Sequence, residues 1–364
     1  MSINATNINA TNSNQAANRD SFRVGVTRDF LQPDGTVAFG DIGLGKLDEA
    51  PGVQWEFLKE NVTELTPEHA NAYDALLVLA PRVTAATLAG NPRLAVVARF
   101  GVGYDTVDVE ACTKSAVALT ITPDGVRRPV AAAVLTFLLA LSHKLLAKDR
   151  LTREGRWAEK LAYQGQGLTG RTLGLIGLGN IGRDIFHLAA PLDMRHLAAD
   201  PFIKPADAER AGAKLVDLET LLRESDYVVV CCALTEGTRH LLNAQRLALM
   251  KPTAYLINLA RGPIVDQQAL TKVLQEKRIA GAGLDVFEHE PISPDDPLLK
   301  LDNVILAPHA LCWTDECFAG NGRSAIQSIL DAAAGKTPQN VVNRAVLESP
   351  AFRQKLQRFA IGAR

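Results

Sequence analysis

The sequence predicts an α/β protein with two parallel-sheet domains, and three observations support this prediction. Its 364 residues exceed what one compact core normally holds and fit two domains. Short strand-like apolar segments alternate with helical stretches along most of the chain, which is the pattern of parallel sheets. A glycine run at 177–182 directly follows one such strand and precedes a helix. With 47% hydrophobic and 22% charged residues, the composition is that of an ordinary globular protein.

The first series of strands is expected within residues 22–121. Strand-like segments are predicted there at 22–27, 75–79, 95–98 and 118–121, with helical stretches between them that include 67–73. The Gly- and Asp-rich stretch 29–47 favours a loop. Residues 1–20 are rich in Asn and lack an apolar signal region, so we expect a disordered tail there.

A long apolar helix is expected to connect the two series of strands. Proline suits the first turn of a helix, so we predict that this helix begins at Pro129. Its apolar run, 130–141, is too short to span a bilayer and favours a core helix. The charged stretch 144–167 that follows is interpreted as a solvated helix or as an arm against another subunit.

The second series is expected to form a complete doubly wound unit. Its predicted strands lie at 172–176, 196–199, 227–231, 254–258, 281–284 and 304–306. A helix at 319–334 then follows, and it is long enough to return to the first domain.

The glycine run is a candidate dinucleotide-binding loop, because a strand precedes it, a helix follows it and an acid ends the next strand. Gly177 would permit the tight turn, Gly179 would let the backbone approach a pyrophosphate, and Gly182 would let the helix pack closely. Asp200 follows Gly177 by 23 positions and would accept hydrogen bonds from ribose hydroxyls. The next residues, Pro201 and Phe202, supply no arginine for a 2′-phosphate, so NAD is expected in preference to NADP. The expected cofactor contacts also include Asn180, Ile181, Ala233, Leu234 and Thr238.

Three chemically distinct side chains, Arg261, Glu290 and His309, follow the last three predicted strands in that order. Because ligands bind outside the carboxyl ends of parallel strands, we expect these side chains to converge. Together they suit the reduction of a 2-keto acid. Arg261 would bind the substrate carboxylate and polarise the C2 carbonyl, His309 would donate the proton, and Glu290 would hydrogen-bond the other ring nitrogen. His289 is the rival base, but only His309 has a strand-end position.

These motifs resemble those of the D-isomer-specific 2-hydroxyacid dehydrogenases (phosphoglycerate, hydroxypyruvate and glyoxylate reductase-like enzymes), over residues 22–343. The resemblance is carried by Gly-Leu-Gly-Asn-Ile-Gly at 177–182, Asn-Leu-Ala-Arg-Gly at 258–262, Gly-Leu-Asp-Val-Phe at 283–287 with Glu290-Pro291, Pro308-His309, and Phe-Gly-Val-Gly-Tyr-Asp at 100–105. It implies a flavodoxin-like substrate domain that is split in sequence, a Rossmann NAD-binding domain, and an active-site cleft between them. The expected boundaries are 21–128 with 322–364 for the substrate domain and 129–321 for the NAD-binding domain.

The resemblance also implies roles for residues other than Arg261, Glu290 and His309. Val102 and Gly103 would offer backbone N–H groups to the substrate carboxylate, and Asp285 and Ala260 would lie near the nicotinamide. Arg99 precedes this loop, at a position where phosphoglycerate dehydrogenases also carry arginine. We therefore expect a substrate longer than pyruvate, with an anionic or polyhydroxylated tail that Arg99 binds.

Two positions depart from the family pattern. Ala132 stands where the family often has an acid, which would reshape the hinge between the domains. Trp313 stands where small residues usually follow the histidine, and it would either alter the substrate pocket or pack at the domain boundary. Arg127 and Arg128 form a cationic pair whose role the sequence leaves open.

The remaining expectations concern partners and location. A net charge of −1 and a pI of about 6.7 give no electrostatic case for nucleic acid or an anionic membrane. The five cysteines show no metal-site spacing, so we expect no metal, free thiols and a cytoplasmic protein. The family resemblance implies a homodimer. An NAD(H)-dependent corepressor-like binding module and a phosphite dehydrogenase-like enzyme remain alternatives, whereas formate dehydrogenases carry glutamine in place of Glu290.

Overall fold

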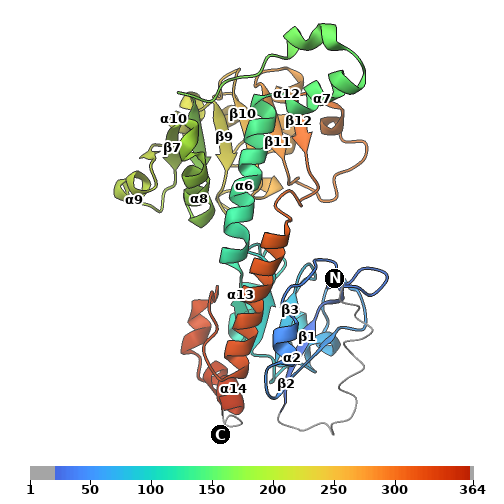
Figure 1. Cartoon of the computed structure of the whole chain (residues 1–364). Coiled ribbons are helices and arrows are strands. Elements are labelled where there is room, and N and C mark those ends of the chain that lie inside the picture. The colour runs from blue at the N-terminus through green and yellow to red at the C-terminus, as the bar shows by residue number, and fades with distance from the viewer. Residues whose placement is uncertain (1–20, 361–364) are drawn as a thin grey trace. The chain divides into compact units, whose positions relative to one another are not determined.

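The structure is a computed structural model that describes residues 21–360, so the tail predicted at 1–20 lies outside the described residues. The chain divides into two compact units (Figure 1). Unit 1 comprises the described residues up to Val126 together with those from Trp313 onward, and unit 2 is Arg127–Cys312. Each unit contains a parallel sheet with helices, which confirms the predicted fold class. Unit 2 begins two residues before the predicted 129, and unit 1 resumes nine residues before the predicted 322.

Unit 1 is built on a five-stranded sheet whose strand pairs are all parallel. The strand order is β2-β1-β3-β4-β5, which is the flavodoxin-like order. The strands are β1 (Phe22–Val26), β2 (Val53–Phe57), β3 (Ala75–Val78), β4 (Val96–Arg99) and β5 (Ala118–Thr120). The helices are α2 (Gly45–Asp48), α3 (Pro67–Ala70), α4 (Ala85–Leu88), α5 (Val109–Lys114), α13 (Asp315–Ala333) and α14 (Pro350–Ala360), with 3-10 turns η1 (Arg28–Phe30) and η6 (Arg344–Glu348).

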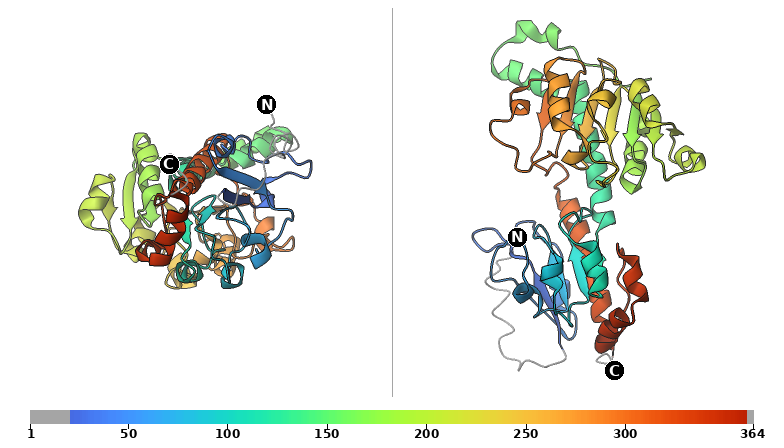
Figure 2. Two further views of the ribbon diagram at one scale, coloured as in Figure 1. Left: turned by 90° about the horizontal axis from the view of Figure 1, so that it is seen from below. Right: turned by 180° about the vertical axis from the view of Figure 1, so that it is seen from behind.

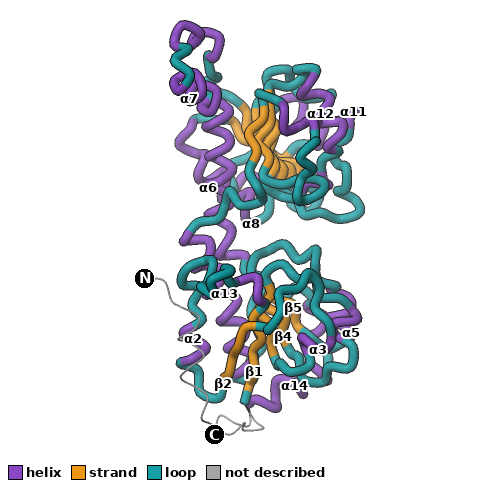
Figure 3. Tube along the Cα trace, turned by 90° about the vertical axis from the view of Figure 1, so that its right-hand side faces the viewer, coloured by secondary structure: helices purple, strands orange, loops and turns teal. Residues whose placement is uncertain are grey.

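Helices cover both faces of the unit 1 sheet, which explains why its central strand β3 is apolar at every position. All residues of β3 are buried. Successive side chains of a strand point to opposite faces. Leu77 therefore joins the core beneath α2 and α13, and its neighbour Leu76 joins the core beneath α3 and α5 (Figure 3).

Unit 2 holds a seven-stranded parallel sheet in the order β12-β11-β10-β9-β6-β7-β8. Counted from β6, this is the Rossmann order with one strand added at the edge. The strands are β6 (Thr172–Ile176), β7 (Arg195–Ala199), β8 (Lys214–Leu215), β9 (Tyr227–Val230), β10 (Tyr255–Asn258), β11 (Gly281–Leu284) and β12 (Val304–Leu306). Its helices are α8 (Asn180–Ala189), α9 (Pro205–Arg210), α10 (Leu218–Glu224), α11 (Ala244–Leu247) and α12 (Gln267–Gln275), with turns η3 (Ala190–Leu192), η4 (Gly262–Ile264) and η5 (Pro297–Lys300).

The helix that links the two series, α6 (Pro123–Ser142), begins earlier than predicted. Pro123 takes the first-turn position, and Pro129 lies inside the helix, where it removes one backbone N–H donor. The apolar run 130–141 is part of a longer helix of 20 residues, and this helix, with a mean hydropathy of 1.4 over an 18-residue window, is long and apolar enough to cross a membrane by length and composition alone. It is nevertheless a core helix, since Val134, Phe137 and Leu138 pack on the unit 2 sheet.

An arm follows α6 in unit 2 and consists of α7 (Leu145–Arg153) and the 3-10 segment η2 (Trp157–Tyr163). Figures 1 and 2 show it extending away from the sheet of this unit. Its apolar side chains are largely exposed, namely Leu145, Leu146, Trp157 and Leu161. The stretch is therefore helical, as the interpretation of a solvated helix required. Its surface is partly apolar and not only charged.

Candidate active site

The glycine loop connects β6 to α8, and its three glycines meet three different requirements. Gly177 has a φ of +95°, and a Cβ atom there would lie 2.8 Å from the backbone nitrogen of Cys232. A Cβ on Gly182 would lie 2.8 Å from the carbonyl oxygen of Gly177, so the first turn of α8 packs directly on the loop. Nothing lies within 4 Å of a Cβ on Gly179. The space beside Gly179 is thus the place where a bulky ligand group can approach the backbone.

The N-terminus of α8 suits an anion. Gly179 is the N-cap and supplies no side-chain hydrogen bond, and the first turn contains no acid. The first N–H groups of a helix have no partner within the helix and attract negative charge. Asn180 and Ile181, two of the predicted cofactor contacts, form this turn. The loop therefore fits a dinucleotide pyrophosphate.

Asp200 follows β7 and is tied to the same loop. One carboxylate oxygen accepts a hydrogen bond of 2.8 Å from Leu178 N–H, and the other accepts one of 2.9 Å from Phe202 N–H. Each carboxylate oxygen can accept a further bond, so ribose hydroxyls can still donate to it. Phe202 is 94% exposed.

The loop after β9 contains the remaining predicted cofactor contacts. The Thr238 hydroxyl donates to the carbonyl of Ala233 at 2.7 Å and accepts from Thr235 N–H at 2.7 Å, which closes the turn on itself. Leu234 lies between them in this turn. Because β9 neighbours β6 in the sheet, the carboxyl ends of the two strands bring this turn and the glycine loop to the same edge.

Arg261 sits in a turn that its neighbours fix. The Asn258 side chain accepts from Ala260 N–H and donates to Arg261 C=O, both at 3.0 Å. The Arg261 guanidinium donates to Ala260 C=O at 2.6 Å. A Cβ on the next residue, Gly262, would overlap the carbonyl of Phe287. The Arg261 turn is therefore pressed against the backbone of the loop that carries Glu290.

Glu290 and His309 form the predicted pair. The Nδ1 atom of His309 lies 2.7 Å from Oε2 of Glu290, and Oε1 of Glu290 accepts from Phe287 N–H at 2.9 Å. Burial raises the pKa of Glu290, but the hydrogen bonds from His309 and Phe287 and the positive charges of His309 and Arg261 outweigh it, so the pKa lies below its usual value. The carboxylate is thus ionised, and the ring is held through Nδ1. His289, the rival, is exposed on the same loop.

Asp285 has partners that the sequence did not predict. Its buried carboxylate accepts hydrogen bonds from Ala310 N–H at 2.9 Å and from Leu311 N–H at 3.1 Å. Burial raises the pKa of Asp285 above its usual value, and these bonds oppose the rise. His309 itself has a φ of +55°, an uncommon conformation for a residue with a side chain. Asp285 therefore braces the backbone just beyond a strained histidine.

A second histidine–carboxylate pair connects the Glu290 loop to the rest of unit 2, and the sequence did not predict it. His240 has Nε2 at 2.6 Å from Oε1 of Glu288. The other Glu288 oxygen accepts from Gln267 N–H, and Glu288 N–H donates to the Gln267 side chain at 2.9 Å. Glu288 stands two positions before Glu290. This network attaches the Glu290 loop to α12, and no local sequence pattern predicts it.

The predicted substrate loop lies in unit 1, after β4. Gly101 N–H donates to the Thr122 hydroxyl at 2.8 Å, and that hydroxyl donates to Asn321 of α13 at 2.7 Å. The Arg99 guanidinium donates to the carbonyl of Phe100. Val102 and Gly103 follow and are partly exposed. The structure thus fixes the base of the loop by a hydrogen-bonded chain to α13.

Arg127 and Arg128 have a structural partner within unit 2. Arg128 Nε lies 3.1 Å and Arg127 Nη1 3.9 Å from the carboxylate of Asp184 in α8, which is 5% exposed. These pairs join α6 to the helix that begins at the glycine loop. These contacts give no indication that Arg127 or Arg128 binds the substrate.

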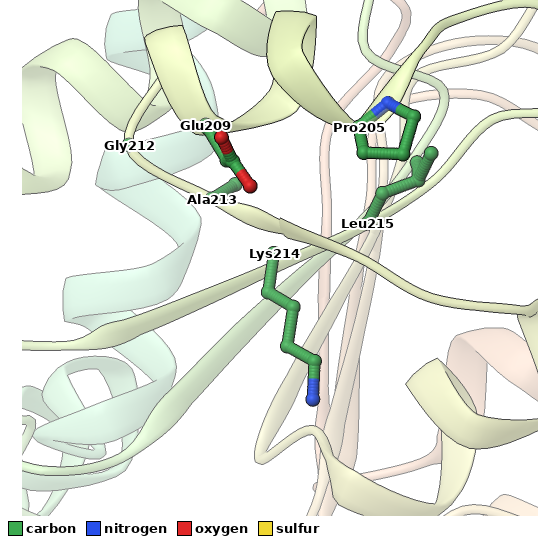
Figure 4. Close-up of a pocket in the computed structure, with 6 residues that line it drawn as sticks. All are labelled: Pro205, Glu209, Gly212, Ala213, Lys214 and Leu215. Carbon is green, nitrogen blue, oxygen red and sulfur yellow. The ribbon is translucent and has the colours of Figure 1, made fainter.

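The structure brings Arg261, Glu290 and His309 to the carboxyl ends of β10, β11 and β12, which are adjacent in the sheet. A hollow of about 380 Å³ elsewhere in unit 2 is lined by Pro205, Glu209 and residues 212–215 (Figure 4). None of the candidate site residues lines it. Within residues 21–360, no group of three His, Cys, Asp or Glu side chains is arranged to hold a metal ion.

Known proteins resemble this chain in sequence and architecture. The family model described as "D-isomer specific 2-hydroxyacid dehydrogenase, NAD binding domain" matches residues 135–310. The glyoxylate reductase of Thermococcus onnurineus is 40% identical over 300 residues, which cover 80% of this chain and 90% of that protein. The structure of Aquifex aeolicus D-lactate dehydrogenase complexed with NAD and lactic acid is 26% identical, with a TM-score of 0.75, and covers 86% of this chain and 96% of that one. The NADPH-dependent glyoxylate/hydroxypyruvate reductase of Sinorhizobium meliloti is 27% identical, with a TM-score of 0.74, and covers 88% of this chain and 98% of that one.

These similarities confirm the family that the motifs indicated, and with it the oxidoreductase class and the cofactor NAD. The chain therefore belongs to the D-isomer-specific 2-hydroxyacid dehydrogenases, NAD-dependent oxidoreductases that act on 2-keto and 2-hydroxy acids.

Proposed function

We propose that this protein reduces a 2-keto acid to the D-2-hydroxy acid with NADH, as the name of its glyoxylate reductase relative suggests. The 2.7 Å contact between His309 Nδ1 and Glu290 Oε2 carries the proposal. It leaves Nε2 as the ring nitrogen that gives a proton to the alkoxide oxygen as it forms. No observation favours the corepressor-like binding module or the phosphite dehydrogenase alternative.

The other residues of the site bind and orient the substrate. Arg261 offers a planar pair of N–H donors to the substrate carboxylate and polarises the C2 carbonyl. The backbone N–H groups of Val102 and Gly103 bind the same carboxylate, and Arg99 supports their loop from the end of β4. In the reverse direction, His309 takes the hydroxyl proton through Nε2 while Glu290 keeps the ring in place.

Residues of unit 2 would hold NAD, which supplies or accepts the hydride at its nicotinamide ring. The open space at Gly179 and the N–H groups of α8 suit the pyrophosphate, and Asp200 suits the ribose. Asp285 and Ala260 lie at the strand ends where the nicotinamide would bind. We accordingly assign unit 2 as the NAD-binding domain and unit 1 as the substrate domain.

We further propose that the protein is a cytoplasmic homodimer. The exposed apolar side chains of the arm support dimerisation, since Leu161 is 85% and Trp157 64% exposed. Light scattering of the wild type and of a double variant, Trp157→Asp with Leu161→Asp, tests this. We expect a dimer for the wild type and a monomer for the variant. A wild-type monomer contradicts the proposal.

The function is tested by following NADH consumption with glyoxylate, pyruvate and hydroxypyruvate, alongside NADPH in place of NADH. We expect turnover of at least one acid with a preference for NADH, and Asp200→Ala should reduce that preference. Absence of turnover with every acid, in a protein that binds NADH tightly, contradicts a reductase and favours a binding module.

A further inference from the structure

Five aromatic side chains of unit 1, here called the aromatic cluster, contact one another: Phe30, Phe39, Phe100, Trp313 and Phe318. The ring centroid of Trp313 lies 5.6 Å from those of Phe39 and Phe318, and Phe39 and Phe318 are 4.5 Å apart. Phe100 packs against Phe30 at 5.0 Å and faces Phe318 at 6.4 Å. The contacts run without a break from the buried core to Trp313.

The aromatic cluster lies at the carboxyl edge of the unit 1 sheet. Phe30 and Phe39 belong to the segment that follows β1, and Phe100 directly follows β4. Phe318 lies near the start of α13, which packs on β4, and Trp313 directly precedes Thr314, the N-cap of this helix. Ligands of open parallel sheets bind at this edge. Phe100 also opens the loop whose backbone, at Val102 and Gly103, is proposed to bind the substrate carboxylate.

Burial divides the aromatic cluster into an inner and an outer part. Phe30 is 0% and Phe100 3% exposed, so both belong to the core. Phe39 and Phe318 are only partly buried, and Trp313 is 51% exposed. A single exposed aromatic residue is common on protein surfaces. Trp313, however, packs on the rings of Phe39 and Phe318 beside the predicted substrate loop, so the three side chains form an apolar surface that a ligand can contact.

The charges next to Trp313 argue against an anionic ligand group at this surface. Asp315 and Glu316 occupy the first turn of α13, two and three residues after Trp313, and both are exposed. They would repel a distal carboxylate or phosphate. On the other side, the Arg99 guanidinium donates to the carbonyl of Phe100, within the base of the loop.

We propose that the outer part of the aromatic cluster, Phe39, Trp313 and Phe318, binds the side chain of the substrate, and that this side chain is apolar and preferably aromatic. The proposal rests on the proposed function, because it places the tail of the 2-keto acid beside the loop that binds its carboxylate. It replaces the anionic or polyhydroxylated tail that Arg99 suggested in the sequence.

Steady-state kinetics with NADH and three substrates test this proposal. The substrates are phenylpyruvate for an aromatic tail, 2-ketoglutarate for an anionic tail and glyoxylate for no tail. The variants are Trp313→Ala, Trp313→Phe and the control Trp55→Ala, which removes an indole from the edge strand β2 of the same unit. We expect phenylpyruvate to have the highest kcat/KM. Trp313→Ala should lower that value roughly tenfold or more and leave glyoxylate within about twofold. Trp313→Phe should recover most of the loss, and Trp55→Ala should change the ratio little.

The outcomes separate this proposal from the proposed function. Reduction of glyoxylate without preference for phenylpyruvate, an equal loss on both substrates in Trp313→Ala, or a preference for 2-ketoglutarate overturns the aromatic subsite and leaves the reductase intact. If no 2-keto acid is reduced, the proposed function fails, and calorimetric titration of the NAD-loaded protein with D-phenyllactate decides the subsite. Binding that weakens tenfold or more in Trp313→Ala supports it, and no binding, or equal binding by both proteins, overturns it.

Discussion

The carboxylate of Asp285 holds the backbone N–H of Ala310, the residue after His309, in a hydrogen bond of 2.9 Å. If this brace is its main role, Asp285→Ala leaves two partly buried N–H groups without their acceptor and lets the strained His309 relax. We expect kcat to fall tenfold or more and the Kd for NADH to stay within about threefold, measured by fluorescence titration. A large rise in the Kd for NADH with unchanged kcat would instead indicate that Asp285 acts mainly through the nicotinamide.

Glu290→Gln should lower kcat more than it changes NADH binding, because the neutral amide holds the His309 ring less firmly than the carboxylate. The lowered pKa of Glu290 also predicts that the stability difference between the wild type and this variant depends on pH. The pKa of Glu290 in the folded protein lies below its ordinary value of 4.5. Its contribution to stability is therefore complete above about pH 5 and is lost as the pH falls through the lowered pKa. The Tm difference between wild type and Glu290→Gln should be constant from pH 8 to about pH 5 and shrink below that. A difference that grows on acidification contradicts this sign.

His240 and Glu288 are predicted to position the loop that carries Glu290. His240→Ala and Glu288→Ala should each lower kcat about tenfold with little change in KM, and the double variant should be no worse than the single variants, because both remove the same contact. His143→Ala, at an exposed histidine next to the arm, is the matched control. Additive effects of the two substitutions would show that the pair does not act as a unit.

Gly262→Ala should disturb the contact between the Arg261 turn and the Glu290 loop. A methyl group there overlaps the carbonyl of Phe287, which is backbone and cannot rotate away. We expect a loss of about 1–3 kcal/mol in the free energy of unfolding and a fall in kcat. Gly167→Ala serves as the control, since nothing lies within 4 Å of a Cβ there. Equal effects of the two substitutions would mean that the two loops are not tightly packed.

Much of the fold was predictable, because buried parallel strands are continuous apolar runs. β6 lies at the predicted positions, and β9 and β10 each differ by one residue. β2 was missed because this edge strand alternates half-buried residues with the exposed Gln54 and Glu56. β8 has only two residues, too few for any periodic signal. The start of α6 was placed at the wrong proline, since Pro123 and Pro129 both suit a first turn and only packing distinguishes them.

The candidate site was predictable to the extent that sheet topology alone determines which residues lie together. Parallel strands end at one edge, so Arg261, Glu290 and His309 were expected together, and the Glu290–His309 contact has the expected form. The second pair was not predictable, because 48 residues separate His240 from Glu288. The bond from Ala310 to Asp285 spans 25 residues in the same way. Such contacts depend on how loops pack, and local sequence patterns do not encode that packing.

The central claim is that His309 is the proton donor in a 2-keto acid reductase. The most direct measurement compares kcat/KM for glyoxylate in the wild type and in His309→Ala, with the Kd for NADH determined on the same preparations. The account predicts that kcat/KM falls about 10²–10⁴-fold while the Kd for NADH changes less than about twofold. Full activity in His309→Ala would contradict it.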